Sequence, residues 1–240
     1  MFNTAKDLFA STVIDTKTKV QNIHSVFVNV QRIYNLNLRS SIQSEMAAGI
    51  LPKTGSLLYY TYFIVNGTLL YKLLEIYDQN NLMEPVITNE VFELFKALII
   101  YIGKGVNARK FSHLINGKQV LLNILDRDKA SPRFSKIAEI WRRCHAVAVI
   151  QLPAETSSYE ALSREYAMIK AAGLDNLTNA INSAPHGTMK KWNENEVVNF
   201  GNMLIYNALN VVVSEKPQLI YKEDVKIKKK SDRKHAKGNK

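Results

Sequence analysis

The chain has 240 residues, of which 46% are apolar, with ten glycines, six prolines and one cysteine. This composition excludes a collagen, a coiled-coil rod and a disulfide-bonded knot, and the lone Cys144 favours a reducing, intracellular compartment. Lysine and arginine (32) outnumber aspartate and glutamate (21), for a net charge of +11. This excess predicts a polyanionic partner, either nucleic acid or an acidic membrane surface. No uninterrupted apolar run approaches the roughly 18 residues of a membrane span, so we expect no membrane insertion.

The N-terminal part of the chain has the apolar spacing of a helix. Between residues 17 and 48, apolar side chains recur every three or four positions, as on one face of a helix. They are Val20, Ile23, Phe27, Val30 and Tyr34. Gly49 and Pro52 then end the pattern. We therefore expect a helical N-terminal extension over residues 1–55 that packs against the domain that follows.

Three short runs of aromatic and β-branched residues predict buried strands, at about 57–65, 98–103 and 145–152. An insertion of about 67–97 separates the first two strands, and its second half has a helical pattern. Helices are expected at about 89–97, 106–115, 134–143, 158–172 and 193–210. Short strands interleaved with helices of this length predict a small sheet covered by helices.

The helix expected over 158–172 has the clearest ends. Ser157 followed by Glu160 has the spacing of a capping box, and Gly173 stands where a left-handed C-terminal cap is favoured. Glu165 falls within the apolar stripe of this helix. A buried carboxylate is costly unless a cation or hydrogen-bond donors meet it. Glu165 therefore either forms a structural salt bridge or lines a site and binds a metal ion.

A group of cationic residues follows the second expected strand. The segment Tyr101–Gly105 reads Tyr-Ile-Gly-Lys-Gly, and its two glycines allow the backbone to approach a phosphate closely. Arg109 and His113 are four residues apart and share one helix face, toward which Lys104 can also point. The spacing excludes a nucleotide-binding P-loop. The pattern predicts a cationic pocket.

In this order the residues resemble the motifs of the GIY-YIG nucleases. Tyr101-Ile102-Gly103-Lys104 is followed by Arg109, the helical Glu165 and Asn179. The longer pattern Tyr-Ile-Gly-Lys-Gly-x3-Arg-x3-His-Leu (101–114), with Arg164-Glu165, Ala171-Ala172-Gly173 and Leu177-Thr178-Asn179, resembles the nuclease domain of the animal ankyrin-repeat and LEM-domain endonucleases. The resemblance spans about residues 56–205. It implies an α+β fold, a three-stranded and mostly antiparallel sheet flanked by helices, in a domain of residues 56–221.

The first motif departs from that of the family. Where the family has Gly-Ile-Tyr, this chain has Tyr60-Thr61-Tyr62, so that Tyr62 alone matches. The flanking strand sets its register, and Tyr59 and Tyr60 are the competitors. The missing Gly-Ile also supports a second hypothesis, a non-catalytic DNA-binding module that retains the nuclease fold.

The resemblance implies a metal-dependent, structure-selective endonuclease that acts on branched or bridged DNA and leaves 5′-phosphate and 3′-hydroxyl ends. Glu165 would bind one divalent ion, Mg²⁺ or Mn²⁺, which acts as a Lewis acid on the phosphate. Lys104 and Arg109 would contact the DNA phosphate and stabilise its developing negative charge.

The remaining motif residues receive roles in proton transfer and positioning. By resemblance, Tyr62 or Tyr101 would orient or deprotonate the attacking water, and Lys104 or the metal would have to lower the pKa of that tyrosine. His113 would contact a phosphate or carry a proton. Asn179 would donate a hydrogen bond that positions Glu165 or a catalytic tyrosine.

The C-terminal segment is strongly basic. Residues 222–240 contain nine lysines and arginines against three acidic residues, a net charge of +6. We expect a disordered tail in which Lys228, Lys229 and Lys230 bind the DNA backbone and release counterions. A nuclear localisation signal is the equal alternative, and a solubilising tail is the third. The expected location is accordingly the nucleus, the cytoplasm or both.

Overall fold

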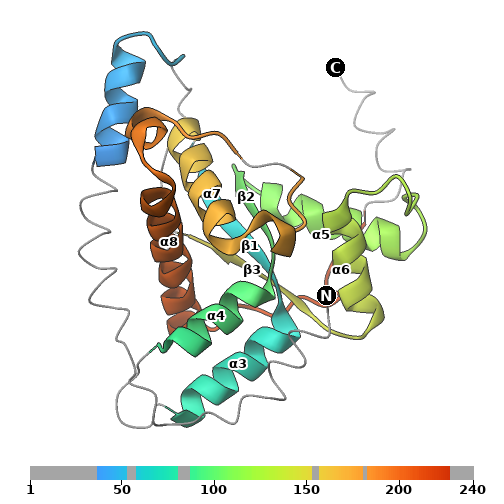
Figure 1. Ribbon diagram of the computed structural model, residues 1–240. Helices are drawn as coiled ribbons and strands as arrows, with labels where there is room; N and C mark the ends of the chain where they lie inside the picture. The colour runs from blue at the N-terminus through green and yellow to red at the C-terminus, as the bar shows by residue number, and fades with distance from the viewer. Residues whose placement is uncertain (1–36, 53–57, 81–86, 153–156, 181–182, 228–240) are drawn as a thin grey trace, which may run out of the picture.

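The computed structural model describes residues 37–52, 58–80, 87–152, 157–180 and 183–227 (Figure 1). A helix over 37–47 comes first. It is followed by β1 (Tyr60–Asn66), α3 (Gly67–Asn80), α4 (Asn89–Leu98), β2 (Ile99–Gly105), α5 (Arg109–Leu121), α6 (Pro132–Arg142), β3 (Val147–Gln151), α7 (Ser158–Ala172), the 3₁₀ helices η1 (Leu174–Asn176) and η2 (Gly187–Lys191), and α8 (Glu194–Glu215).

The three strands form one antiparallel sheet in the order β2-β1-β3, which confirms the expected α+β class. All seven residues of β1 are buried, because this central strand has a strand on each side and helices on both faces. Tyr62 pairs with Gly103 of β2 and with Gln151 of β3. The strands begin and end within three residues of the predicted positions, since the apolar runs extend into the turns.

Helices cover both faces of the sheet (Figure 1), and the side chains of β1 alternate between these two layers. Phe63 and Val65 face a large apolar core that α3, α4, α7 and α8 share. Tyr60, Tyr62 and Ile64 face a smaller cluster that includes residues of α5 and α6. The two layers therefore receive different side chains from the same strand.

Helix α7 has the predicted bounds, with one difference at its N-terminal cap. The Ser157 side chain accepts a hydrogen bond from the Glu160 backbone N–H at 3.2 Å, and Gly173 ends the helix with φ of +81°. The carboxylate of Glu160 turns away from the cap, because Arg39 and Arg164 bind it at 3.1 Å and 2.7 Å. Half of the predicted capping box is thus replaced by a buried ion network.

Helix α8 extends to Glu215, five residues beyond the predicted end, because its buried apolar face continues through Val212. A full capping box of Asn193 and Glu196 begins the helix. Among the described residues, α8 is long and apolar enough to cross a membrane by length and composition, although the sequence shows no unbroken apolar run. More than half of that stretch is buried, and an added Cβ at Gly201 would collide with the Ala167 carbonyl of α7. Helix α8 is therefore packed closely against α7 in the core.

Strand β1 ends at Asn66, and Gly67 starts α3 directly after it. A Cβ at Gly67 would lie 2.8 Å from the Val147 carbonyl carbon, so that glycine is needed here for the close approach to β3. The helix over 37–47 packs Leu38 and Ile42 into the α7–α8 core. The apolar stripe of residues 20–34 lies outside the described residues.

Candidate active site

The site begins at the centre of the sheet, where Tyr62 lies opposite Gly103. A Cβ added to Gly103 would lie 2.9 Å from the Tyr62 hydroxyl oxygen and 2.6 Å from Cε1 of Tyr101. The absence of a side chain at residue 103 thus makes room for two tyrosine rings. From the sequence, Gly103 was expected to let the backbone approach a phosphate closely. In the structure, it allows the rings of Tyr62 and Tyr101 to pack.

The two competitors for the first-motif tyrosine have other partners. The Tyr60 hydroxyl donates to the Asn107 carbonyl at 2.6 Å and thereby fixes the turn between β2 and α5. The Tyr59 ring lies 5.1 Å from Nζ of Lys104, at the start of the strand. Tyr62 is the tyrosine that meets both Tyr101 and His113, with ring centroids 6.1 Å and 6.0 Å away.

His113 of α5 forms a short hydrogen bond with Tyr62. The Tyr62 hydroxyl oxygen lies 2.6 Å from Nε2 of His113, and the tautomer of the ring sets which atom donates. Burial, followed by the charges of Arg133 and Arg109, lowers the pKa of His113 to about 4. The imidazole is therefore neutral at physiological pH. Its other nitrogen, Nδ1, is buried and has no hydrogen-bond partner among the residues the structure describes.

The pKa of both tyrosines is raised, which contradicts the expectation that Lys104 lowers it. Burial is the largest cause for Tyr62 and for Tyr101, and the charge of Glu165 raises the pKa of both further. In the opposite direction, the charge of Arg109 lowers the pKa of both tyrosines, and the charge of Arg133 lowers that of Tyr101. Neither hydroxyl ionises at neutral pH in the free protein.

Lys104 connects β2 to the helix that carries the carboxylate. Its Nζ donates to the hydroxyl of Ser158, the first residue of α7, at 2.7 Å. Burial lowers the pKa of Lys104, while the charge of Glu165 raises it. The lysine therefore lies within the electrostatic field of Glu165, as the sequence interpretation required.

Glu165 is 8% exposed and forms no salt bridge within the described part of the chain. Its neighbour Arg164 is paired with Glu160. Burial raises the pKa of Glu165, whereas a hydrogen bond with Ser183 and the charges of Lys104, Arg109 and Arg133 lower it. The structural salt bridge that was one alternative for Glu165 is thus found one helical turn earlier, at Glu160.

The donors at this position fit a magnesium-type ion better than a zinc-type ion. No group of three His, Cys, Asp or Glu side chains that could hold a metal occurs among the described residues. Mg²⁺ is commonly bound by one or two carboxylates together with water and substrate phosphate, whereas zinc needs at least three protein ligands. Glu165 alone is consistent with an ion that it shares with a bound phosphate.

Asn179 positions the backbone of β2, and within the described part of the chain its side chain forms no hydrogen bond with Glu165 or with a tyrosine side chain. Its Nδ2 donates to the Ile102 carbonyl at 2.8 Å, and its Oδ1 accepts from the Ile102 N–H at 3.1 Å. The N–H and hydroxyl of Thr178 both donate to the Ile100 carbonyl at 2.8 Å. These bonds cover the outer edge of β2 on either side of Tyr101, so Asn179 acts through the strand.

Two arginines complete the site, and sequence reasoning found one of them. Arg109 begins α5 and is exposed, and its charge affects Tyr62, Tyr101, Lys104 and His113. Arg133, in the first turn of α6, was missed. Its Cζ lies 4.7 Å above the centre of the Tyr101 ring. Nothing in the motif spacing indicates it, because the packing of α6 on the sheet is a tertiary contact.

The predicted DNA-binding residues Lys228, Lys229 and Lys230 lie outside the described residues. The chain that leads to them is anchored beside α5. Val225 is buried in the same cluster as Tyr62, and its carbonyl accepts a hydrogen bond from Nζ of Lys118 at 2.6 Å. The basic segment therefore starts from the layer of the protein that carries His113 and Arg109.

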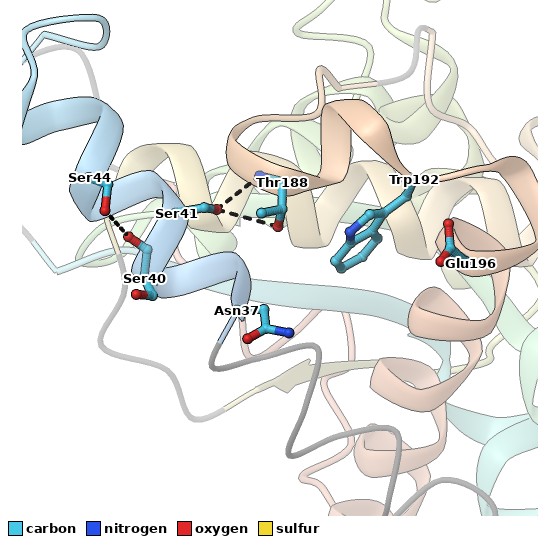
Figure 2. A pocket seen from close by; sticks show the side chains of 7 residues that line it. All are labelled: Asn37, Ser40, Ser41, Ser44, Thr188, Trp192 and Glu196. Carbon is cyan, nitrogen blue, oxygen red and sulfur yellow. Dashed lines mark hydrogen bonds between the residues drawn. The ribbon is translucent and has the colours of Figure 1, made fainter.

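A hollow of about 510 Å³ lies away from these residues, between the helix over 37–47 and the η2–α8 segment (Figure 2). Figure 2 shows Ser41 pointing toward Thr188, whose N–H it accepts at 2.9 Å. The Ser41 hydroxyl also donates to the Leu38 carbonyl at 2.9 Å. These bonds connect the N-terminal helix to the domain, so the polar lining at Ser41 and Thr188 has a structural function.

A family model described as the LEM-3-like GIY-YIG domain matches residues 59–227. The chain belongs to this family. GIY-YIG domains are nuclease domains that act on DNA, which agrees with the resemblance carried by the motif residues. The match covers every described residue of the site, from Tyr62 to Asn179.

Among known proteins, this LEM-3-like GIY-YIG domain is similar to the Ankyrin repeat and LEM domain-containing protein 1 homolog of Caenorhabditis elegans, with 29% identity over 58% of the chain. Ankyrin repeat and LEM domain-containing protein 1 is 25% identical in Mus musculus and 26% identical in Homo sapiens, each over 58% of the chain. The matched region spans 20% of the worm protein, 26% of the mouse protein and 23% of the human protein. No solved structure matches the chain.

Proposed function

We propose that the chain is a metal-dependent endonuclease that hydrolyses phosphodiester bonds in branched or bridged DNA and leaves 5′-phosphate and 3′-hydroxyl ends. The observation that carries this proposal is the convergence of one buried carboxylate, Glu165, with Arg109 around the pair Tyr62 and Tyr101, with Lys104 beside Glu165. A phosphodiester needs a positioned water, cations for the phosphate oxygens and help for the leaving oxygen. Each need has a residue here.

The proton of the attacking water has a path through Tyr62. Because burial raises its pKa, the Tyr62 hydroxyl is a poor base by itself. His113 is neutral and lies 2.6 Å away, so its bare Nε2 accepts the Tyr62 proton while the tyrosine oxygen takes a proton from water. The Tyr101 ring, whose centroid lies 6.1 Å from that of Tyr62, packs beside it and helps to hold it in place. In this proposal Tyr62 is the water-orienting residue and His113 is the proton acceptor.

The phosphate is bound by the cations of β2 and α5. Arg109 is exposed at the helix start and faces the phosphate oxygens, and Lys104 stabilises the negative charge that develops on them. Water forms the new P–O bond as the bond between phosphorus and the 3′ oxygen breaks. A Mg²⁺ or Mn²⁺ ion held by Glu165, when bound, supplies a Lewis acid for the phosphate and for the departing 3′ oxygen.

The basic segment increases affinity for DNA of any sequence. Lys228, Lys229 and Lys230 follow the anchored Val225, and we propose that they contact the DNA backbone near α5. Backbone contacts position a protein without reading bases, which agrees with a preference for DNA shape. The resemblance to ankyrin-repeat and LEM-domain proteins supports branched DNA as the substrate and an intracellular location with access to DNA.

The test is a cleavage assay on labelled four-way junction, flap, duplex and single-stranded DNA with and without Mg²⁺. We expect Mg²⁺-dependent nicking of the branched substrates with 5′-phosphate ends, and loss of product for Glu165→Gln. Glu75→Gln is the matched control, because Glu75 is an exposed carboxylate on α3. Full activity of Glu165→Gln would remove the metal-ligand assignment. Tight binding with no product over hours, unaffected by Mg²⁺, would instead support a binding module without catalysis.

A further inference from the structure

The group of charged side chains near Tyr101 has more positive charge than its carboxylate balances. The charges of Arg109 and Arg133 both affect Tyr101 and His113, and Lys104 and Glu165 act on each other. Within the part of the chain that the structure describes, these groups comprise three cations and one carboxylate. Like charges placed together repel each other in the free protein, and a bound polyanion relieves that repulsion.

The guanidinium group of Arg133 lies over the rings of Tyr101 and Phe134. Its Cζ lies 4.7 Å from the Tyr101 ring centre and 5.4 Å from that of Phe134, and its Nε donates to the Ser131 hydroxyl at 3.1 Å. The residue is half-buried and forms no ion pair with any described residue. A guanidinium has five N–H donors, of which this arrangement uses one. The donors on its two Nη atoms are therefore available to an acceptor from outside the protein.

A role restricted to packing would not require a charge at this position. A methionine would cover the Tyr101 and Phe134 rings equally well without adding a third cation beside Arg109. The planar guanidinium, in contrast, combines ring stacking with a donor pair that matches the oxygens of a phosphate. The geometry therefore selects for a ligand with phosphate oxygens, arriving on the side of the sheet that α5 and α6 cover.

We propose that Arg133 is a further substrate-binding residue of the proposed nuclease site, which contacts a DNA phosphate from α6 while it stacks on Tyr101. This inference rests on the proposed function for the identity of the polyanion. Arg109 from α5 and Arg133 from α6 then bind the DNA strand from two helices, on either side of the tyrosine pair. The fixed guanidinium also holds the Tyr101 ring in its place beside Tyr62.

The experiment measures binding, so that it does not depend on catalysis. All proteins carry Glu165→Gln to keep the DNA intact, and the dissociation constant of a labelled four-way junction is measured between about 50 and 200 mM salt. Arg133→Met and Arg133→Gln are compared with Arg142→Met. Arg142 is exposed and lies on the same helix, nine residues on, which is two and a half turns and about 13 Å along the axis. It thus faces the opposite side of α6.

We expect Arg133→Met to weaken binding about tenfold and to reduce the salt slope by about one, as loss of one phosphate contact requires. Arg142→Met should leave both values unchanged. The unfolding temperature of Arg133→Met should be no lower than that of the parent, since the repulsion from Arg109 is removed. If the methionine variant fails to fold, Arg133→Gln, which can still donate to Ser131, provides the same comparison.

A parent-like salt slope and affinity in the folded variant, or an equal loss in Arg142→Met, would overturn the proposal and leave Arg133 as a packing residue. Failure of the proposed function has a different signature. In that case the chain without Glu165→Gln cleaves no DNA in Mg²⁺, whereas the effect of Arg133→Met on the salt slope persists. The two results can therefore be read independently.

Discussion

The two faces of the sheet differ in what they pack against. On the face covered by α3, α4, α7 and α8, Phe63 and Val65 join a large apolar core, and α7 adds buried polar groups beside it, Glu160, Ser163, Arg164 and Glu165. On the face covered by α5 and α6, Tyr62 and Tyr101 lie among His113, Arg133 and aromatic rings. One central strand supplies both faces, so its alternation separates the residues that stabilise the fold from those suited to chemistry.

The difference shows on which face the residues of the site reduce the stability of the fold. Burial raises the pKa of Tyr62 and lowers that of His113, and Nδ1 of His113 has no partner among the described residues. Such groups contribute less to stability than apolar side chains of the same size. The apolar side chains of the α3–α4–α7–α8 core should therefore respond to mutation mainly in stability, and the polar groups around Tyr62, together with Glu165 of α7, mainly in activity.

The largest effect is expected on the apolar face. Phe200 of α8 is fully buried, and Phe200→Ala should reduce the free energy of unfolding by about 3 to 5 kcal/mol. Urea denaturation followed by circular dichroism measures this value. Phe111→Ala on α5 is the control, since Phe111 is 43% exposed and its loss should cost no more than about 0.5 kcal/mol. Similar losses at both positions would show that the faces are not distinct.

The pH dependence of stability should identify the other face. His113 has a pKa of about 4 in the folded chain against 6.5 when exposed, so the unfolded chain binds the proton more readily between these values. The contribution of the neutral His113 to the free energy of unfolding is complete above pH 6.5 and is lost as the pH falls toward 4. Its upper limit is about 3 kcal/mol. His113→Asn should flatten this part of the stability curve relative to the parent. Parallel curves for the two proteins would contradict the buried, neutral imidazole.

Loss of a phosphate-facing cation should separate activity from stability. Arg109→Ala should reduce the cleavage rate by about a hundredfold or more, because a single transition-state donor is worth about 2.7 kcal/mol or more. Arg109 is exposed, so the unfolding midpoint in urea should stay within error of the parent. Single-turnover cleavage with Arg142→Ala as control provides the comparison. A rate within a few-fold of the parent would make Arg109 an ordinary surface charge.

The smallest effect is expected for an exposed ion pair on the surface of the protein. Lys216 binds Asp78 at 2.8 Å, with about half of each side chain exposed. Surface pairs contribute about 0 to 1 kcal/mol, so Lys216→Ala should change neither cleavage nor the urea midpoint measurably. A loss comparable to that of Phe200→Ala would mean that the link between α3 and the end of α8 belongs to the core.

Local signals in the sequence predicted the three strands and the approximate positions of α4 to α8, but not α3. The bounds of α7 follow from Ser157 and Gly173, and the position of β1 follows from its unbroken apolar run. The motif residues led to Tyr62, Lys104, Arg109, His113 and Glu165, which the structure brings together. These features depend on residues close together in the chain, so they can be predicted from the sequence.

Features that depend on distant contacts could not be predicted. The close approach of Gly67 to Val147 of β3 joins residues that are eighty positions apart in the chain. The bidentate bond of Asn179 to Ile102 and the stacking of Arg133 on Tyr101 also join separate segments. Burial, which is a property of the folded chain, also explains why Lys104 does not lower the pKa of either tyrosine.

The hydrogen bonds of Thr178 and Asn179 to β2 have a counterpart at the other side of the sheet, where Ile220 bridges to Val147 of β3. A three-stranded sheet has two outer strands whose free N–H and C=O groups can recruit strands from other molecules. Here short loop segments occupy part of both. Opening the β2 side by Asn179→Ala should therefore show itself first as self-association during concentration, before any change in the chemistry of the site.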